Sequence, residues 1–213
     1  MPVTKDGLPV LIPVLVVTAL SLWLAFCKCG GWWYFAVPMV LFTLFSLWFF
    51  RDPERKIPVG EDTIVSPGDG KVLELVPVEH DEFIGGPAQR LSIFLSVFNV
   101  HVNRNCISGV VRDVKRFPGK FRVAYDHRAT EENNRLRVDL ESPKGKLRCV
   151  QVTGAIARRI VCHLSVGDSV TKGERYGMIR FGSRMDIILP ATAKVVVKKD
   201  DSVHGGSTVI AHW

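Results

Sequence analysis

The sequence predicts a mainly β protein, with a sandwich-like or barrel-like domain that follows an N-terminal two-helix membrane hairpin. Two long apolar runs without any charged residue lie near the N-terminus, which predicts the hairpin. Beyond residue 56, short runs of alternating apolar and polar residues are separated by turn residues at roughly ten-residue spacing, which predicts the β domain. At 213 residues the chain is long enough for one substantial domain with an appendage.

The two apolar runs, 8–26 and 32–50, predict membrane-spanning helices. Each has about 19 residues, and a helix of that length spans roughly 28 Å, close to the hydrocarbon thickness of a bilayer. Pro13 and Pro38 are tolerated in membrane helices. A signal peptide is disfavoured because "CKCGG" leads directly into a second apolar run, and an interfacial helix is disfavoured because neither run has a charged face.

Charged residues at the ends of these runs predict their orientation. Lys5 precedes the first run, Arg51, Arg55 and Lys56 follow the second, and Lys28 is the only cation in the short connection. The positive-inside rule then places both ends of the hairpin in the cytoplasm. We therefore expect residues 1–56 to form the hairpin and residues 57–213 to form a domain on the cytoplasmic side of the cell (inner) membrane.

The remainder of the chain reads as strands with one short helix. A helical piece is expected at 129–134, where Thr130 is a possible cap. The expected strands are 63–65, 71–78, 90–97, 109–116, 135–142, 146–153, 159–166, 176–181, 185–189, 193–198 and 208–211.

An internal repeat marks two of the turns. "DSVTKG" at 168–173 returns as "DSVHGG" at 201–206, 33 residues later, and each copy lies between two strand-like runs. The pattern resembles the turns of biotinyl and lipoyl carrier domains. The lysine turn that those carriers modify is missing here, so the likeness concerns the backbone.

Composition excludes several kinds of site. The formal charge of +7 and the pI near 9.3 permit an anionic partner but do not select one. Five cysteines without C-x-x-C spacing indicate neither a disulfide framework nor a zinc site, so reduced thiols are expected. No P-loop, dinucleotide fingerprint or H-E-x-x-H motif occurs, and no metal, pyridoxal phosphate or nucleic-acid partner is expected.

Three local signals remain as candidate sites. Asp69 lies between two glycines in "SPGDGKV", His101 closes the apolar run "FLSVFNVHVNRN", and Gly182 and Ser183 interrupt a strand-like stretch. Each has an ordinary explanation, namely an Asp-Gly turn, a packed histidine and a common dipeptide. Ser183 has no G-x-S-x-G elbow around it, so it does not read as a conventional hydrolase serine.

Taken together, the motifs carry a family resemblance. "FFRDPER", "SPGDGKV", "FLSVFNVHVNR", "PGKF", "EENNR", "GAIARRIVC" and "GDSVTKGERYGMIRFGSR" follow one another in the order typical of the phosphatidylserine decarboxylase family, in its short, archaeal-type branch. The likeness runs from about Phe49 to the C-terminus, and the last block is the most specific.

The resemblance implies that the chain is a proenzyme that cleaves itself between Gly182 and Ser183. Ser183 would attack the carbonyl of Gly182, and β-elimination and loss of ammonia would then leave a covalent pyruvoyl group at residue 183. The products would be a large chain, 1–182, and a small chain, 183–213, held as a heterodimer that could form higher oligomers. The pyruvoyl group would act as an electron sink through a Schiff base with the substrate amine.

The resemblance also assigns helpers to this reaction. His101 matches the first histidine of the family's H-x-x-H segment and Asp69 matches its acidic turn. The second histidine of longer members is replaced by Arg104, so which group takes its part is open. Arg104, Arg158 and Arg159 are candidates for binding the headgroup, because arginine suits phosphate. His163 and His204 match nothing functional.

The function implied is decarboxylation of phosphatidylserine to phosphatidylethanolamine and CO2, with membrane lipid as substrate. Two alternatives stay open. The first is an archaetidylserine decarboxylase, and the second, of another class, is a non-catalytic membrane-tethered lipid-binding β domain that would leave Ser183 intact.

Overall fold

The computed structural model describes residues 2–28, 30–123, 129–155, 159–180 and 183–213. The chain divides into two compact units, Met1–Pro53 and Glu54–Trp213, which are taken separately below. Gly182 and Arg158, two of the residues named above, lie outside the described residues.

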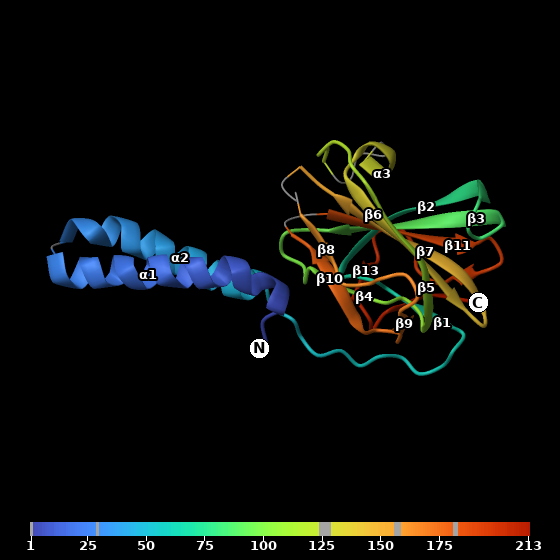
Figure 1. The fold of residues 1–213 in the computed structure, drawn as a ribbon, viewed down its shortest axis with the longest axis horizontal. Coiled ribbons are helices and arrows are strands. Elements are labelled where there is room, and N and C mark those ends of the chain that lie inside the picture. Colours follow the sequence, from blue (N-terminus) through green and yellow to red (C-terminus); the bar gives the residue numbers. More distant parts are fainter. Residues whose placement is uncertain (1, 29, 124–128, 156–158, 181–182) are drawn as a thin grey trace. The chain divides into compact units, whose positions relative to one another are not determined.

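The first unit is the expected helical hairpin (Figure 1). Helix α1 spans Leu8–Lys28, helix α2 spans Trp33–Phe49, and short 3-10 turns at Lys5–Gly7 and Gly30–Trp32 precede them. Both helices are long and apolar enough to cross a membrane. At the open end the segments before α1 and after α2 are joined, since the Thr4 N–H donates to the Phe50 carbonyl at 2.9 Å.

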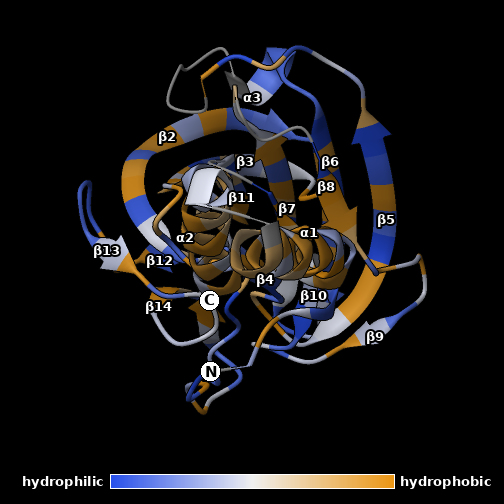
Figure 2. Cartoon of the chain, turned by 90° about the vertical axis from the view of Figure 1, so that its left-hand side faces the viewer, coloured by the Kyte–Doolittle hydropathy of each residue, from blue (hydrophilic) through white to orange (hydrophobic). Residues whose placement is uncertain are grey.

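Polar contacts lie between the two helices and apolar side chains lie outside them. The Thr18 and Thr43 hydroxyls are 2.7 Å apart and buried, an arrangement typical of helices that associate in lipid. In contrast, Val16 and Leu41 are 62% and 61% exposed. Figure 2 views both helices end-on and shows them as predominantly hydrophobic. The hairpin therefore presents the surface expected of a membrane-embedded element.

The second unit is mainly β, as expected, and is built from three antiparallel sheets. A curled eight-stranded sheet runs in the order β13-β2-β3-β11-β7-β6-β5-β9, and two three-stranded sheets run β1-β14-β12 and β4-β10-β8 (Figures 1 and 2). The strands are β1 Thr63–Val65, β2 Gly70–Asp81, β3 Gly86–Leu95, β4 Val102–Arg104, β5 Gly109–Phe117, β6 Arg135–Ser142, β7 Gly145–Thr153, β8 Ile160–Cys162, β9 Ser169–Val170, β10 Arg175–Ile179, β11 Ser183–Pro190, β12 Lys194–Val195, β13 Ser202–Val203 and β14 Val209–His212. One short helix, α3, spans Ala129–Glu132.

Strand β11 is central to the large sheet and its two faces differ. It pairs with β3 on one side and β7 on the other. Met185, Ile187 and Leu189 are fully buried in the main hydrophobic core. Side chains alternate along a strand, so Ser183 belongs to this core face, whereas Arg184 belongs to the opposite face.

The expected strands are largely confirmed, but the run 193–198 forms strand only at Lys194–Val195, and β9 and β13 lie in the repeat turns, where no strand was expected. The run 159–166 forms strand only at Ile160–Cys162, because the backbone turns away to begin the loop before the first repeat. Strand β4 was not expected, since Asn103 and Arg104 are polar residues that the fold buries. In both repeats Ser-Val forms a two-residue strand, and the glycine that ends the repeat has a positive φ, +80° at Gly173 and +78° at Gly206.

Candidate active site

Ser183 is the first residue of β11 and its side chain is completely buried. It lies opposite Leu95, the last residue of β3, and opposite Thr153, the last residue of β7. The Ser183 hydroxyl has no hydrogen-bond partner among the described residues. A buried hydroxyl without a partner is destabilising by about 1–3 kcal/mol, so the fold gains no stability from this group.

The turn that carries Asp69 lies at the same end of the sheet. Asp69 directly precedes β2, which is separated from β11 only by β3, so two strand spacings or roughly 10 Å lie between the two strands. A Cβ on Gly68 would lie 3.2 Å from the Leu95 side chain and 3.4 Å from the Asn103 amide. The Asp69 turn is thus in contact with the end of β3 and with β4.

His101 lies just before β4 and is fully buried. Its Nδ1 is 2.9 Å from the Asn99 carbonyl oxygen, which only accepts. Nδ1 therefore carries the proton, and a neutral ring has its lone pair on Nε2. Because Val102 pairs with Met178, His101 lies at the end of β10 from which the chain continues toward Ser183.

The Asp69 carboxylate contacts groups other than His101. Among the described residues, its carboxylate accepts hydrogen bonds from the Arg55 guanidinium at 2.7 Å and the Gly205 N–H at 2.8 Å, and His204 Nδ1 is 3.4 Å away. His204 was expected to have no functional contact, yet it lies against this carboxylate. Asp69 is thus 6% exposed and held by groups 14 and more than 130 residues away in sequence.

The candidate headgroup arginines lie at two different places. Arg159 is exposed and precedes β8, and its carbonyl accepts from the Arg180 N–H at 3.2 Å, which puts it at the Ser183 end of β10. Arg104 pairs with Arg175 at the opposite end of β10, where its guanidinium donates to the Gly173 carbonyl at 3.0 Å.

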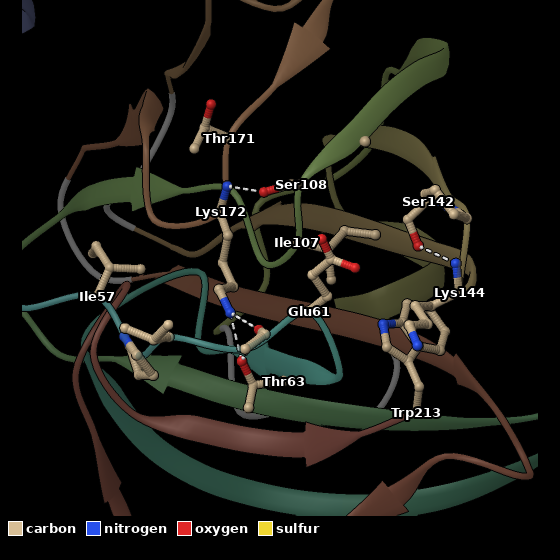
Figure 3. A pocket seen from close by; sticks show the side chains of 15 residues that line it. Ile57, Glu61, Thr63, Ile107, Ser108, Ser142, Lys144, Thr171, Lys172 and Trp213 are labelled. Atoms are coloured by element: carbon tan, nitrogen blue, oxygen red, sulfur yellow. Dashed lines mark hydrogen bonds between the residues drawn. The ribbon is translucent and has the colours of Figure 1, made fainter.

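Two cavities open on the side of the β unit where Arg104 lies. One, of about 540 Å³, is lined by Arg104 together with Arg55, Lys172 and Arg175. The other, of about 550 Å³, is mostly apolar, and Figure 3 shows Trp213 and Ile107 in its wall with Lys172 bonded to Thr63. Burial lowers the pKa of Lys172. Neither lining includes Ser183, His101 or Asp69.

Other reactive groups are buried away from this site. The Cys106 and Cys149 sulfurs are 3.2 Å apart in the core, and both are free thiols. Burial raises the pKa of Cys106 well above its ordinary value, and the contact with Cys149 adds to the rise. Within the described ranges, no group of three or more His, Cys, Asp or Glu side chains is arranged to hold a metal ion.

Sequence reasoning missed several residues that surround the candidate groups. Arg55 was assigned only to membrane orientation, and Asn103, Gln151 and Thr153 were assigned to nothing. The Gln151 amide donates to Asn103 at 2.8 Å, and both side chains are fully buried. The signal available was Gln151, a polar residue between Val150 and Val152 of β7, because a polar side chain that a strand buries needs a buried hydrogen-bond partner.

Comparison with known proteins gives consistent matches. The sequence profile of the phosphatidylserine decarboxylase family matches residues 42–211. A phosphatidylserine decarboxylase proenzyme of Chlorobium chlorochromatii is 52% identical over 174 residues, covering 82% of each chain. Proenzymes of the same name are 44% identical in Rhodopirellula baltica, over 100% of this chain and 89% of the relative, and 42% identical in Geobacter metallireducens, over 98% and 95%.

These matches extend well beyond the strands around Ser183 and include both the Asp69 turn and the His101 segment. By its sequence and by the length over which it matches, the chain belongs to the phosphatidylserine decarboxylase family.

Proposed function

We propose that this protein decarboxylates phosphatidylserine to phosphatidylethanolamine, after cutting itself between Gly182 and Ser183 to make a pyruvoyl group at residue 183. The observation that carries the proposal is the Ser183 hydroxyl, which is fully buried at the start of β11 and has no hydrogen-bond partner among the described residues. Such a group is explained by chemistry rather than by stability. The names of the relatives favour phosphatidylserine over archaetidylserine as the substrate.

Self-cleavage needs a nucleophile and a base. Ser183 Oγ attacks the Gly182 carbonyl carbon, and the C–N bond breaks to give an ester with a free amino group at residue 183. A base then removes the proton from Cα183, and the Oγ–Cβ bond breaks, which releases the upstream chain as a carboxylate. The resulting dehydroalanine takes up water and loses ammonia.

His101 is proposed as the base and later as a proton donor. Its Nδ1 hydrogen bond to Asn99 orients the ring and leaves Nε2 as the atom that accepts a proton. Burial of His101 and Ser183 excludes water from the reacting atoms. Once formed, the pyruvoyl group supplies an electron sink for the electrons left by departing CO2.

Asp69 is proposed to act with His101 as part of the site, through the electrostatic environment rather than through a direct relay. Its negative charge is held by Arg55 at the same end of the sheet as Ser183. The proposed consequence is a preference for a protonated, positively charged partner nearby, which suits both His101 after it accepts a proton and the ammonium of the incoming serine headgroup.

For the anionic parts of the substrate we propose Arg159 as a phosphate-binding residue, together with Arg158, which precedes it in the sequence. Arg159 is exposed and lies at the Ser183 end of β10. Arg104 remains a candidate through the cavity it lines with Arg55 and Arg175, where a second anionic group could bind.

The hairpin is proposed to insert in the cell (inner) membrane with the β unit on the cytoplasmic side. Arg51 stacks on Trp48 at 4.0 Å, a pairing typical of the membrane interface, and lies with Lys5 at the open end of the hairpin. A membrane-impermeant maleimide applied from outside the cell should then label Cys27, which is exposed in the last turn of α1. Labelling only after the membrane is opened would refute this orientation.

The test of the proposed function is the mass of the purified protein. Denaturing electrophoresis with intact-mass measurement should show chains of 182 and 31 residues, and the smaller should begin with a ketone in place of the serine amine. Purified material should release CO2 from phosphatidylserine vesicles. A chain of 213 residues that stays whole after long incubation, with Ser183 unaltered, would support a lipid-binding domain instead.

A further inference from the structure

The side chain next to Ser183 is an arginine that the fold buries completely. Arg184 is 0% exposed, yet it lies on the face of β11 opposite the hydrophobic core. Burying a guanidinium is unfavourable unless its charge is paired and its N–H groups are bonded. The fold pairs the charge and bonds Nε and Nη2 with partners from three strands, whereas Nη1 has no hydrogen-bond partner among the described residues.

Arg184 forms hydrogen bonds to three residues on adjacent strands, level with the position two residues further along β11. Glu74 of β2, Ser92 of β3 and Asp186 of β11 lie side by side in register. The Arg184 Nε donates to Asp186 at 2.6 Å, and its Nη2 donates to Glu74 at 2.8 Å and to Ser92 at 2.6 Å. Two of these three partners belong to strands before residue 182.

Partners of this row extend the network further. The Thr130 hydroxyl of α3 donates to the other Asp186 oxygen at 3.0 Å, and Arg90 lies 3.4 Å from the Glu74 carboxylate. Two arginines thus face two carboxylates, so the charges balance within a network in which Arg184 and Asp186 are buried and Arg90 and Glu74 are half-buried. Charge-assisted bonds of this kind are short and restrict geometry more than neutral ones.

Peptide planarity connects this network to residue 183. The atoms from Cα183 through the amide to Cα184 lie in one plane, and the two Cα atoms are about 3.8 Å apart. In the pyruvoyl form Cα183 is the ketone carbon. Whatever fixes the position of Arg184 therefore also fixes where the ketone carbon lies.

We propose that Arg184 is a positioning residue, whose bonds to Glu74, Ser92 and Asp186 hold the pyruvoyl carbon in place after self-cleavage. This inference rests on the proposed function. Before the cut, residue 183 is covalently held from both sides, whereas afterwards it is the free end of a strand, and strand ends otherwise fray. The network supplies the restraint that the broken peptide bond no longer gives.

The test compares Arg184→Lys with Arg148→Lys in the full-length protein. Arg148 is a matched control, because it is also a buried arginine on the same sheet face, bonded to Asp139 and Asp81, and it is opposite Ile188 rather than residue 184. Lysine keeps the charge in both variants but cannot bridge several acceptors in the plane of a guanidinium.

We expect Arg184→Lys to cleave fully and to form the ketone in wild-type yield by intact mass. Its kcat should fall at least tenfold with KM within twofold, since a displacement near 1 Å can lower a rate about a hundredfold. The rate at which a hydrazide probe labels residue 183 should change as well. Arg148→Lys should keep kcat and labelling rate within twofold of wild type.

Three results would overturn the inference. One is equal loss of kcat in both variants, the second is an unchanged Arg184→Lys enzyme, and the third is a folded Arg184→Lys chain that fails to cleave, which would place its action before the cut. If Arg184→Lys does not fold, Ser92→Ala replaces it, with an expected loss of about threefold in kcat; a wild-type kcat there would also refute the proposal. Failure of the proposed function can be distinguished from failure of this inference, because in the first case the wild-type chain itself would remain uncleaved.

Discussion

The two units of this chain arrange the same apolar residue types in opposite ways. In the hairpin, Val16 and Leu41 point outward and Thr18 and Thr43 meet between the helices. In the β unit, the apolar side chains of β11 and its neighbours are buried and the polar network of Arg184 lies on the other face of the sheet.

This difference shows which solvent each unit is built for. An outward apolar surface is stable against hydrocarbon, where close packing and hydrogen bonds between helices, rather than the hydrophobic effect, favour their association. An inward apolar core is stable against water. We therefore assign the membrane contact to the hairpin and the chemistry to the β unit, and each prediction below challenges that division.

The largest effect is expected from Ser183→Ala, which removes the nucleophile from the β unit. Self-cleavage and CO2 release should both fall to background, because neither the ester nor the ketone can form. Membrane association should be unchanged, as measured by co-sedimentation with vesicles. An alanine variant that still yields a 31-residue fragment would contradict the assignment of this serine.

Next in size is the effect of charge on the hairpin surface. Val16→Lys with Leu41→Lys should weaken membrane insertion, since a lysine near the centre of a membrane helix is unfavourable by about 2.5–3.5 kcal/mol. Flotation with vesicles measures the bound fraction, and Val16→Ala with Leu41→Ala is the matched control. Activity on substrate dissolved in detergent should persist, and loss of self-cleavage in the lysine variant would break the proposed division.

His101→Ala should slow both self-cleavage and decarboxylation and should leave membrane association unchanged. Removal of a general base or acid typically costs a factor of about 10²–10⁴ in rate. The rate of appearance of the small chain and the kcat of any processed enzyme measure its two proposed roles separately. Normal rates in both would show that another group moves these protons.

The smallest effect concerns alkaline pH. Burial raises the pKa of Cys106, and also that of Tyr176, well above the ordinary values. Groups whose folded pKa is raised stabilise the fold fully below the unfolded pKa, about 8.5 for cysteine and about 10 for tyrosine, and lose that contribution as pH rises. The free energy of unfolding should therefore decline above about pH 9, at most by about 1.4 kcal/mol per pH unit for each group.

The control for this effect compares a buried thiol with an exposed one. Cys106→Ala should flatten the decline, whereas Cys27→Ala, at an exposed position in the hairpin, should leave it unchanged. If the free energy of unfolding declined with pH equally in both variants, the buried thiol of Cys106 would not be the cause.

Much of this fold could be predicted from the sequence, because hydropathy patterns report which residues are buried. Alternation of apolar and polar residues gave β6 its observed bounds, Arg135–Ser142, and the uncharged runs gave both helices. Strand β4 could not be predicted in this way. Its Asn103 and Arg104 are buried by hydrogen bonds to Gln151 and Gly173, which lie 48 and 69 residues away in sequence.

In the candidate site, too, contacts between residues distant in sequence could not be predicted. The sequence could nominate Ser183, Asp69 and His101 through family motifs, but the partners of Asp69 depend on strand order. His204 meets this carboxylate because it follows β13, which pairs with β2, and Arg55 reaches it from the segment before β1. Arg184 was unpredictable for a further reason, since an arginine beside a serine in sequence reads as a solvent-exposed charge.

The register of β11 also bears on what scission would do to the molecule. Residues after the cut supply a central strand and an edge strand of one sheet, β11 and β13, and two of the three strands of another, β12 and β14. A severed backbone would therefore leave two polypeptides interleaved in a single cooperative fold. Simple dilution should never part them, and only conditions that melt the whole β unit should release the shorter one.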